Sequence, residues 1–197
     1  MSTLRIAIVT GSTRPGRNNY AVARWVHELA ERRSGAEFEL VDIADYRLPL
    51  FDEPTSPMFG DYTKAHTKAW SEKIASFDGY VFVTPEYNHS IPAALKNAVD
   101  FLYREWNNKA AGFVSYGGAG GLRAVEHLRL VLSELMVATV RGQVMLSLVT
   151  DFEHFRTFKP LPKREAELAA VLDQVVAWAT AMKTLRGGAV RVHSHDR

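Results

Sequence analysis

The chain has 197 residues, 47% hydrophobic and 23% charged, a composition typical of one soluble globular domain with a substantial core. Its 24 Lys and Arg residues nearly balance its 22 Asp and Glu residues, and the resulting net charge of +2 gives little support for nucleic-acid binding. The absence of cysteine excludes disulfides, thiolate metal sites and dithiol redox chemistry.

The amino terminus enters an apolar run after three residues, so the sequence shows no signal peptide. No apolar run approaches the ~20 residues that a membrane span requires. We therefore expect a cytoplasmic protein with neither a membrane nor a nucleic acid as partner.

Strand and helix patterns alternate along the chain. Short apolar runs predict strands, and apolar residues at helical spacing predict helices. The predicted strands are residues 4–10, 37–43, 80–84, 110–115 and 139–148; the predicted helices include residues 22–29, 64–76, 93–102, 122–136 and 168–179. Residues 44–63 and 150–162 are predicted loops, and the first is longer than most connections within a domain. We expect one domain over residues 1–186 and a polar tail over residues 187–197.

Five strands alternating with five helices indicate an α/β fold with a parallel sheet covered on both faces. Right-handed crossovers leave few topologies, of which the strand order 2-1-3-4-5 is one. This order places the ends of the first and third strands side by side at a switch point, where open α/β sheets bind ligands. We expect three loops to meet there, one after each of the first, third and fourth strands.

The first of these loops follows residue 10 and has the composition of a phosphate site. It lacks both the P-loop pattern and G-x-G-x-x-G, because Gly11 and Gly16 are five residues apart. Arginine suits phosphate oxygens, and a helix start favours an anion. The candidate ligands are Ser12, Thr13, Arg14, Arg17, Asn18 and Asn19. The alternative is a solvated loop with an ordinary asparagine helix cap.

The second and third loops offer planar and hydrogen-bonding groups. Between Pro85, which ends a strand, and Pro92, which starts a helix, lie Glu86, Tyr87, Asn88 and His89. The third loop contains Ser115 and Tyr116, followed by Gly117, Gly118, Gly120 and Gly121. Together these loops suit a flat heteroaromatic ring with polar edges. The alternatives are that Tyr87 packs in the core, that His89 is structural, that Glu86 is an exposed loop charge and that the glycines only make a turn.

Three motifs resemble those of the NADPH-dependent FMN reductase family, the flavodoxin-like group of small quinone, azo-dye and chromate reductases. They are G-S-x-R at residues 11–14, P-E-Y-N-H-S-I-P at residues 85–92 with L-K-N-A at residues 95–98, and S-Y-G-G at residues 115–118. The second motif is highly specific, whereas G-S-x-R alone is weak. The resemblance extends over residues 4–182 and implies a flavodoxin-like three-layer sandwich.

The resemblance also implies bound FMN, with NADPH or NADH as co-substrate. Its phosphate would lie on Ser12, Arg14, Arg17, Asn18 and Asn19. Its ring would lie on Pro85, Glu86, Tyr87 and Asn88, with Ser115, Tyr116, Gly117 and Gly118 on the other side. Many relatives have a serine where this chain has residues 17–19, so which of the three touches phosphate stays open. No catalytic side chain or metal is implied.

The activity implied by the resemblance is hydride transfer from NAD(P)H to FMN and then to a quinone, a flavin, an azo compound or a metal oxyanion. The resemblance implies a homodimer, or a dimer of dimers, with residues 93–102 and 44–63 as candidate contacts. A flavodoxin-like electron carrier and a flavin-free phosphate-binding module are the competing hypotheses. The sequence does not decide between NADPH and NADH.

Overall fold

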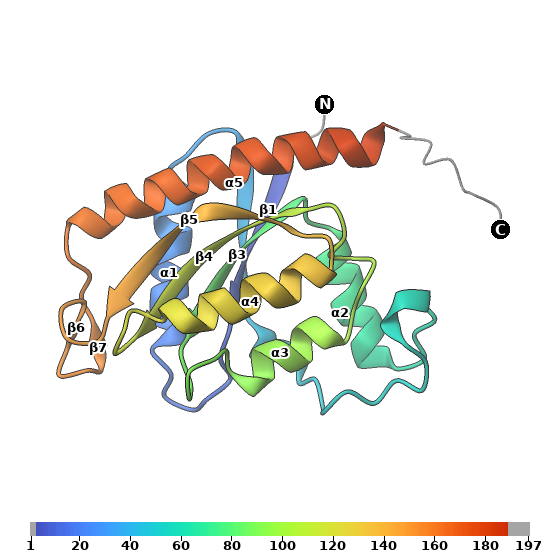
Figure 1. Cartoon of the computed structure of the whole chain (residues 1–197), viewed down its shortest axis with the longest axis horizontal. Coiled ribbons are helices and arrows are strands. Elements are labelled where there is room, and N and C mark those ends of the chain that lie inside the picture. Colours follow the sequence, from blue (N-terminus) through green and yellow to red (C-terminus); the bar gives the residue numbers. More distant parts are fainter. Residues whose placement is uncertain (1–2, 189–197) are drawn as a thin grey trace.

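The computed structural model describes residues 3–188 and contains a five-stranded parallel sheet in the order β2-β1-β3-β4-β5 (Figure 1). The strands are β1 (Leu4–Thr10), β2 (Ala36–Val41), β3 (Gly79–Pro85), β4 (Ala110–Gly117) and β5 (Ala138–Ser147). The helices are α1 (Asn19–Ala30), α2 (Ala65–Ala75), α3 (Ala93–Asp100), α4 (Leu122–Glu134) and α5 (Lys163–Gly187). The predicted α/β class and strand order are confirmed.

Each face of the sheet is covered by helices. Successive side chains of a strand point to opposite faces, and in β3 Val81 and Val83 belong to one core while Tyr80 and Phe82 belong to the other. Residues of α1 and α5 complete the first core, and residues of α2, α3 and α4 complete the second. Burial on both faces explains why the central strands are continuous apolar runs rather than alternating patterns.

Several predicted boundaries were wrong by a few residues. The second strand ends at Val41 because the side chain of Asp42 accepts a hydrogen bond from the amide of Ala44 and starts a 3₁₀ helix, η1 (Ile43–Tyr46). The predicted helices at residues 93–102 and 122–136 end two residues early, at Asp100 and Glu134. Conversely, β4 continues through Tyr116 and Gly117, which were expected in the glycine-rich loop, because it pairs with β3 and β5 to its end.

Both predicted loops contain regular structure. The first includes η1 and a second 3₁₀ helix, η2 (Pro57–Phe59), and the carboxylate of Glu53 accepts hydrogen bonds from the amides of Thr63 and Lys64 at the start of α2. The second contains a hairpin of β6 (Phe152–Glu153) and β7 (Thr157–Phe158). The predicted tail at residues 187–197 begins with the last residue of α5, and residues 189–197 lie outside the described residues.

No apolar run in the sequence predicted a membrane span, but helix α5 has the length of one. Among residues 3–188 it is the one helix that is long and apolar enough to cross a membrane, judged by length and composition alone, with a mean hydropathy of 1.2 over 18 residues. Its stripe of Leu168, Val171, Leu172, Val175 and Ala179 is buried in the core that α1 shares. Packing against the sheet therefore accounts for the apolar stripe of this helix.

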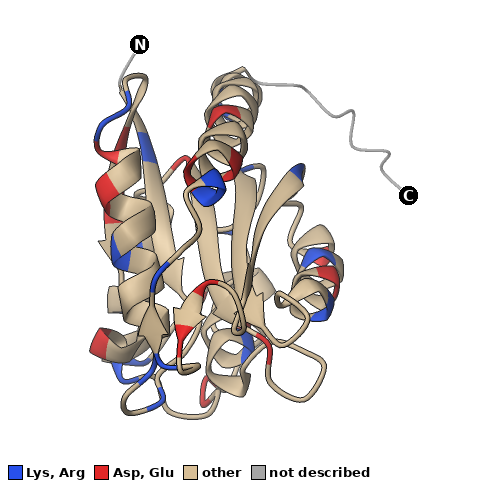
Figure 2. Cartoon of the chain, turned by 90° about the vertical axis from the view of Figure 1, so that its left-hand side faces the viewer, with Lys and Arg blue, Asp and Glu red and all other residues tan. Residues whose placement is uncertain are grey.

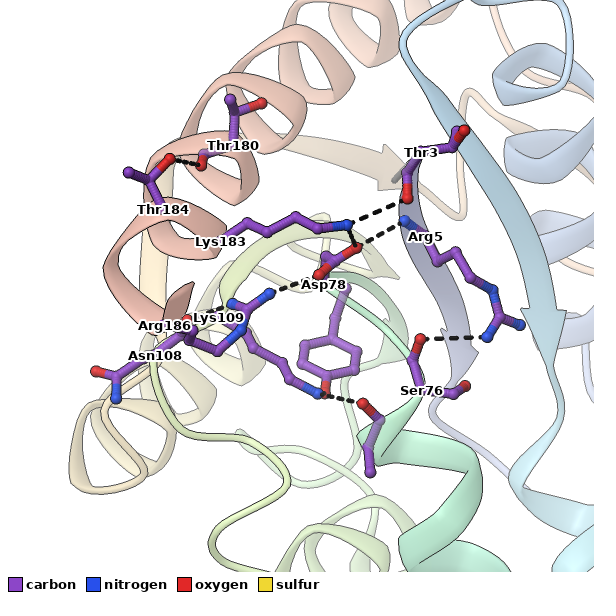
Figure 3. A network of polar contacts seen from close by, with 12 residues as sticks. Thr3, Arg5, Ser76, Asp78, Asn108, Lys109, Thr180, Lys183, Thr184 and Arg186 are labelled. Atoms are coloured by element: carbon purple, nitrogen blue, oxygen red, sulfur yellow. Dashed lines mark hydrogen bonds and ion pairs between the residues drawn. The ribbon is translucent and has the colours of Figure 1, made fainter. Parts of the chain in front are cut away.

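The amino-end edge of the sheet is held by buried and half-buried charges (Figure 3). The carboxylate of Asp78, just before β3, accepts hydrogen bonds from the amide of Arg5 and from the side chains of Lys183 and Arg186 at 2.6–3.1 Å. The buried ammonium of Lys109 donates to the carbonyls of Ile74 and Ala75 at the end of α2 and to the hydroxyl of Tyr80. These contacts join α5 and α2 to the strands.

Burial, together with the nearby Arg186 guanidinium, lowers the pKa of Lys109 to about 7. In the unfolded chain the pKa of a lysine is about 10.4. Between these two pKa values the unfolded chain binds more protons than the fold, so this group makes the free energy of unfolding rise with pH.

Lys109→Met is expected to remove this rise. Between pH 7 and pH 9 the natural protein should gain stability relative to the variant, measured by urea denaturation at both pH values. Lys68→Met, on the exposed side of α2, is the control and should keep the natural slope. Equal slopes in the natural protein and the Lys109 variant would contradict the assignment.

Candidate functional site

The buried amide of Asn19 locks the first loop to β3. Its Oδ1 accepts a hydrogen bond from the amide of Gly11 at 3.0 Å, and its Nδ2 donates to the carbonyl of Val83 at 2.8 Å. The Gly11 amide also donates to the Val83 carbonyl at 2.7 Å. A Cβ on Gly11 would lie 2.8 Å from that oxygen, so this approach requires glycine. The carboxyl ends of β1 and β3 therefore meet as the strand order predicts.

Tyr87 connects the second loop to the first. Its hydroxyl shares a hydrogen bond with the hydroxyl of Ser12 at 3.0 Å, and the guanidinium carbon of Arg14 lies 5.9 Å from its ring centroid. Ser12 is buried, Tyr87 is half-buried and Arg14 is exposed. Residues 12–14 thus lie against residue 87, and Tyr87 bridges two loops instead of packing in the core.

The three residues that the sequence left undecided differ in their contacts. Arg17 forms an ion pair with Asp42 at 2.5 Å, but its buried Nε has no hydrogen-bond partner among the described residues. The Asn18 amide reaches the carbonyl of Phe155 at 3.3 Å, whereas both polar atoms of the Asn19 side chain are engaged within the protein. An unpaired buried donor costs free energy unless an acceptor binds it. Among the three, Arg17 alone has a buried donor without a partner in the described part of the chain, and this donor suits a phosphate oxygen.

The side chain of Glu86 links the second loop to α4. Its side chain is only 6% exposed, it pairs with the guanidinium of Arg123, and its Oε2 accepts a hydrogen bond from the Arg123 amide at 3.2 Å. Its own amide donates to the carbonyl of Tyr116 at 3.0 Å. The alternative of an exposed loop charge is wrong, because Glu86 is a buried link between two loops.

The third loop turns sharply at its glycines. Gly121 has a φ of +74°, and a Cβ there would lie 2.7 Å from the Cβ of Ser115. The hydroxyl of Ser115 donates to the carbonyl of Gly120 at 2.7 Å. Tyr116 is buried, and this burial, with the neighbouring Tyr87, raises the pKa of its phenol well above 10. Gly118 and Ala119 are the exposed residues of this loop, and a Cβ at Gly118 would meet only open space.

A cleft of about 350 Å³, which no sequence pattern predicted, opens beside the first loop. It is lined by Thr13, Arg47 and Asn97, among others. The amide of Asn97 accepts from the Phe51 amide and donates to the Pro49 carbonyl, so it fastens the long loop after β2 to α3. The one signal in the sequence was Asn97 itself, in the L-K-N-A motif.

The sequence profile of the NADPH-dependent FMN reductase family matches residues 4–151. The chain belongs to this family. The matched residues include all three loops described above. The family assignment therefore rests on the same segments that the fold brings together at the carboxyl edge of the sheet.

Curated relatives of this FMN reductase agree with the assignment. An NAD(P)H-dependent FMN reductase of Schizosaccharomyces pombe is 44% identical over 151 residues, 76% of each chain. A quinone reductase of Escherichia coli is 38% identical over 135 residues, covering 66% of this chain and 69% of the relative. Among solved structures, the flavoenzyme FerB of Paracoccus denitrificans, an NAD(P)H:(acceptor) oxidoreductase, has a TM-score of 0.72 at 23% identity and covers 91% of this chain and 99% of its own. That likeness supports the flavodoxin-like fold.

The residues of this reductase fit FMN at both ends of the cofactor. The unpaired Nε of Arg17 and the exposed guanidinium of Arg14 suit a phosphate at the start of α1. The exposed residues Asn88 and Gly118 offer polar groups to the edge of a flat ring. Ser115, Tyr116 and Asn19 face inward and support these loops.

Asn19→Ala should remove the two side-chain hydrogen bonds that hold the first loop against β3. The substitution leaves the amide of Gly11 with only one acceptor and removes a donor from the Val83 carbonyl, at a cost of roughly 1–3 kcal/mol. Urea denaturation measures this loss. Asn18→Ala, which removes only a longer exposed contact, should change stability by less than about 0.5 kcal/mol. Equal losses in both variants would refute the structural role of Asn19.

Proposed function

We propose that this protein is an NAD(P)H-dependent oxidoreductase that holds FMN and passes a hydride from NAD(P)H to a small acceptor. The acceptor is a quinone, a flavin, an azo compound or a metal oxyanion. The observation that carries the proposal is the contact of Ser12 and Arg14 with Tyr87, because it joins the candidate phosphate loop to the candidate ring loop. When bound, FMN supplies the hydride-accepting and hydride-donating chemistry.

In this proposal the residues of the chain bind the cofactor and orient its ring. Arg14 and Arg17 hold the phosphate, with Ser12 and Asn18 beside them and Asn19 supporting the loop from within. Pro85, Glu86, Tyr87 and Asn88 form one wall of the ring site, and Ser115, Tyr116, Gly117 and Gly118 form the other. Hydride transfer between rings requires stacking at about 3–3.5 Å. The ion pair and hydrogen bond between Glu86 and Arg123 hold the second loop in place for such positioning.

A flavodoxin-like electron carrier is the second candidate, and three observations disfavour it. Carriers of that kind tend to be acidic, whereas this chain has a net charge of +2. Basic and acidic residues are interspersed on the side of the molecule in Figure 2 rather than gathered by sign. The relatives with matching sequences are named as reductases. A flavin-free phosphate module is likewise disfavoured by the family assignment.

The visible spectrum of the purified protein, followed by identification of the released chromophore, tests the cofactor. NADPH oxidation with and without 1,4-benzoquinone then tests the reaction, and NADH in the same assay measures nucleotide preference. A yellow protein that releases FMN and oxidises NADPH in a quinone-dependent manner meets the proposal. A colourless protein that takes up no added FMN would exclude it.

We further propose a cytoplasmic homodimer, or a dimer of dimers, built on the loop that follows η1. Four large apolar side chains of this loop are exposed: Leu50 by 84%, Phe51 by 40%, Met58 by 49% and Phe59 by 63%. Asn97 fastens Pro49 and Phe51 to α3, so Leu50 and Phe51 are held beside that helix. Exposed apolar side chains held in this way favour association.

Arg14→Ala should weaken FMN binding by roughly 1.5–3 kcal/mol, the scale of one hydrogen bond to a charged group. Quenching of flavin fluorescence on titration measures the affinity. Arg24→Ala, which removes an exposed arginine from α1, is the matched control and should bind FMN as the natural protein does. An unchanged affinity for Arg14→Ala would remove Arg14 from the phosphate site.

Leu50→Asp should shift the protein toward monomer, because a carboxylate at this position would have to be desolvated in an apolar contact. Size-exclusion chromatography with light scattering reports the mass. Leu185→Asp, an exposed position on α5, serves as the control. If both variants keep the natural mass, this loop is not the contact.

A further inference from the structure

The second loop contains a strained two-residue turn. The backbones of Tyr87 and Ser90 exchange two hydrogen bonds of 2.9 and 3.0 Å, and Asn88 and His89 between them have φ values of +47° and +73°. Turns of this kind prefer Asn-Gly, because the second position favours glycine. A histidine there carries a conformational cost. The structure therefore keeps an imidazole where glycine would be more stable.

A second imidazole faces the first. His127, in the second turn of α4, lies with its ring centroid 6.1 Å from that of His89, at an interplanar angle of 45°. Its Nδ1 shares a hydrogen bond with the hydroxyl of Ser90 at 2.9 Å. Its Nε2 has no protein partner among residues 3–188, and both rings are exposed. Ser90 thus fixes the orientation of His127 while its second nitrogen stays available.

The arginine that binds the second loop lies on the same face of α4 as His127. Arg123, one turn before His127, pairs with Glu86, so these two charges neutralise each other. His89 follows the ring-site residues Tyr87 and Asn88 directly, and α4 follows the glycine loop. Both imidazoles are exposed, and both are held at the second loop, which is one of the two walls of the proposed ring site.

We infer that His127, with His89 beside it, is the proton donor to the acceptor, and that Ser90 is its positioning residue. The inference rests on the proposed function and deepens it. A quinone that gains a hydride, which NAD(P)H ultimately supplies, also needs one proton to become a hydroquinone. The imidazolium N–H bond breaks, an O–H bond forms on the quinone oxygen, and solvent returns the proton to imidazole. The overall change is NAD(P)H + H⁺ + quinone → NAD(P)⁺ + hydroquinone.

An acceptor that takes electrons without protons separates this role from a general effect on the flavin. Positioned general acids contribute about 10²–10⁴-fold. In the FMN-loaded protein, His127→Gln should lower kcat/KM for 1,4-benzoquinone at least tenfold and leave kcat/KM for ferricyanide within twofold. His27→Gln, on α1, should change neither. Equal losses with both acceptors, or no loss with benzoquinone, would overturn the inference.

The positioning role of Ser90 is tested by replacing and restoring its hydroxyl. Ser90→Ala should lose part of the benzoquinone activity, and Ser90→Thr should recover it, because the hydroxyl orients His127. Ser90→Ala with natural activity, or Ser90→Thr without recovery, would overturn this role.

His89→Gly supplies a readout that a structural histidine would not give. Relief of the positive φ should raise the urea midpoint, while kcat/KM for benzoquinone falls. If activity and stability fall together, or if activity is retained, His89 has no role toward the acceptor.

Imidazole resonances give a readout without turnover. Hydroquinone added to the oxidised, FMN-loaded protein should shift the NMR signals of His89 and His127 but not of His27, and unmoved signals would overturn the inference. Failure of the proposed function is distinguishable, because then the natural protein would take up no FMN or NADPH would not bleach its visible absorbance.

Discussion

The side chain of Asn19 fixes the geometry on which the candidate site depends. Its two polar atoms satisfy the amide of Gly11 and the carbonyl of Val83, so the first loop cannot move away from β3 without exposing buried polar groups. From this fixed point Ser12 reaches Tyr87, and Tyr87 continues into the second loop. The convergence of distant segments is thus a consequence of hydrogen-bond satisfaction in the core as much as of topology.

Among residues 3–188, charged side chains are paired at the amino-end edge of the sheet, whereas some donors stay unpaired at the carboxyl edge. At the amino-end edge the donors of Lys109 and the carboxylate of Asp78 are paired within the protein, which ties helices to strands. At the carboxyl edge Arg14 is exposed and Arg17 retains an unpaired buried Nε. Satisfied networks stabilise a fold, whereas unpaired donors favour an external acceptor. This contrast supports the proposal that the cofactor binds at the carboxyl edge.

The sequence predicted what local patterns encode: the five strands, their order and the loops that carry the motifs. It did not predict the pairs of Arg17 with Asp42 and of Glu86 with Arg123, because these partners are 25 and 37 residues apart and no periodicity links them. The β6–β7 hairpin was missed because its two-residue strands are too short for an alternating pattern and owe their place to packing of Phe152 and Phe158. The roles of Ser115 and Tyr116 as supports likewise follow from tertiary packing.

The turn at Asn88 and His89 shows where the rigidity of the second loop originates. Asn88 is tolerated at a positive φ, but His89 at a positive φ costs of order 1–2 kcal/mol, and such strain persists only when the surrounding structure enforces it. Helix α4 holds the turn through the ion pair of Arg123 with Glu86 and the hydrogen bond of His127 with Ser90. The hydrogen bond from the Glu86 amide to the Tyr116 carbonyl also holds it. These contacts join the second loop to the end of β4 and to the first turns of α4, beside the proposed ring site.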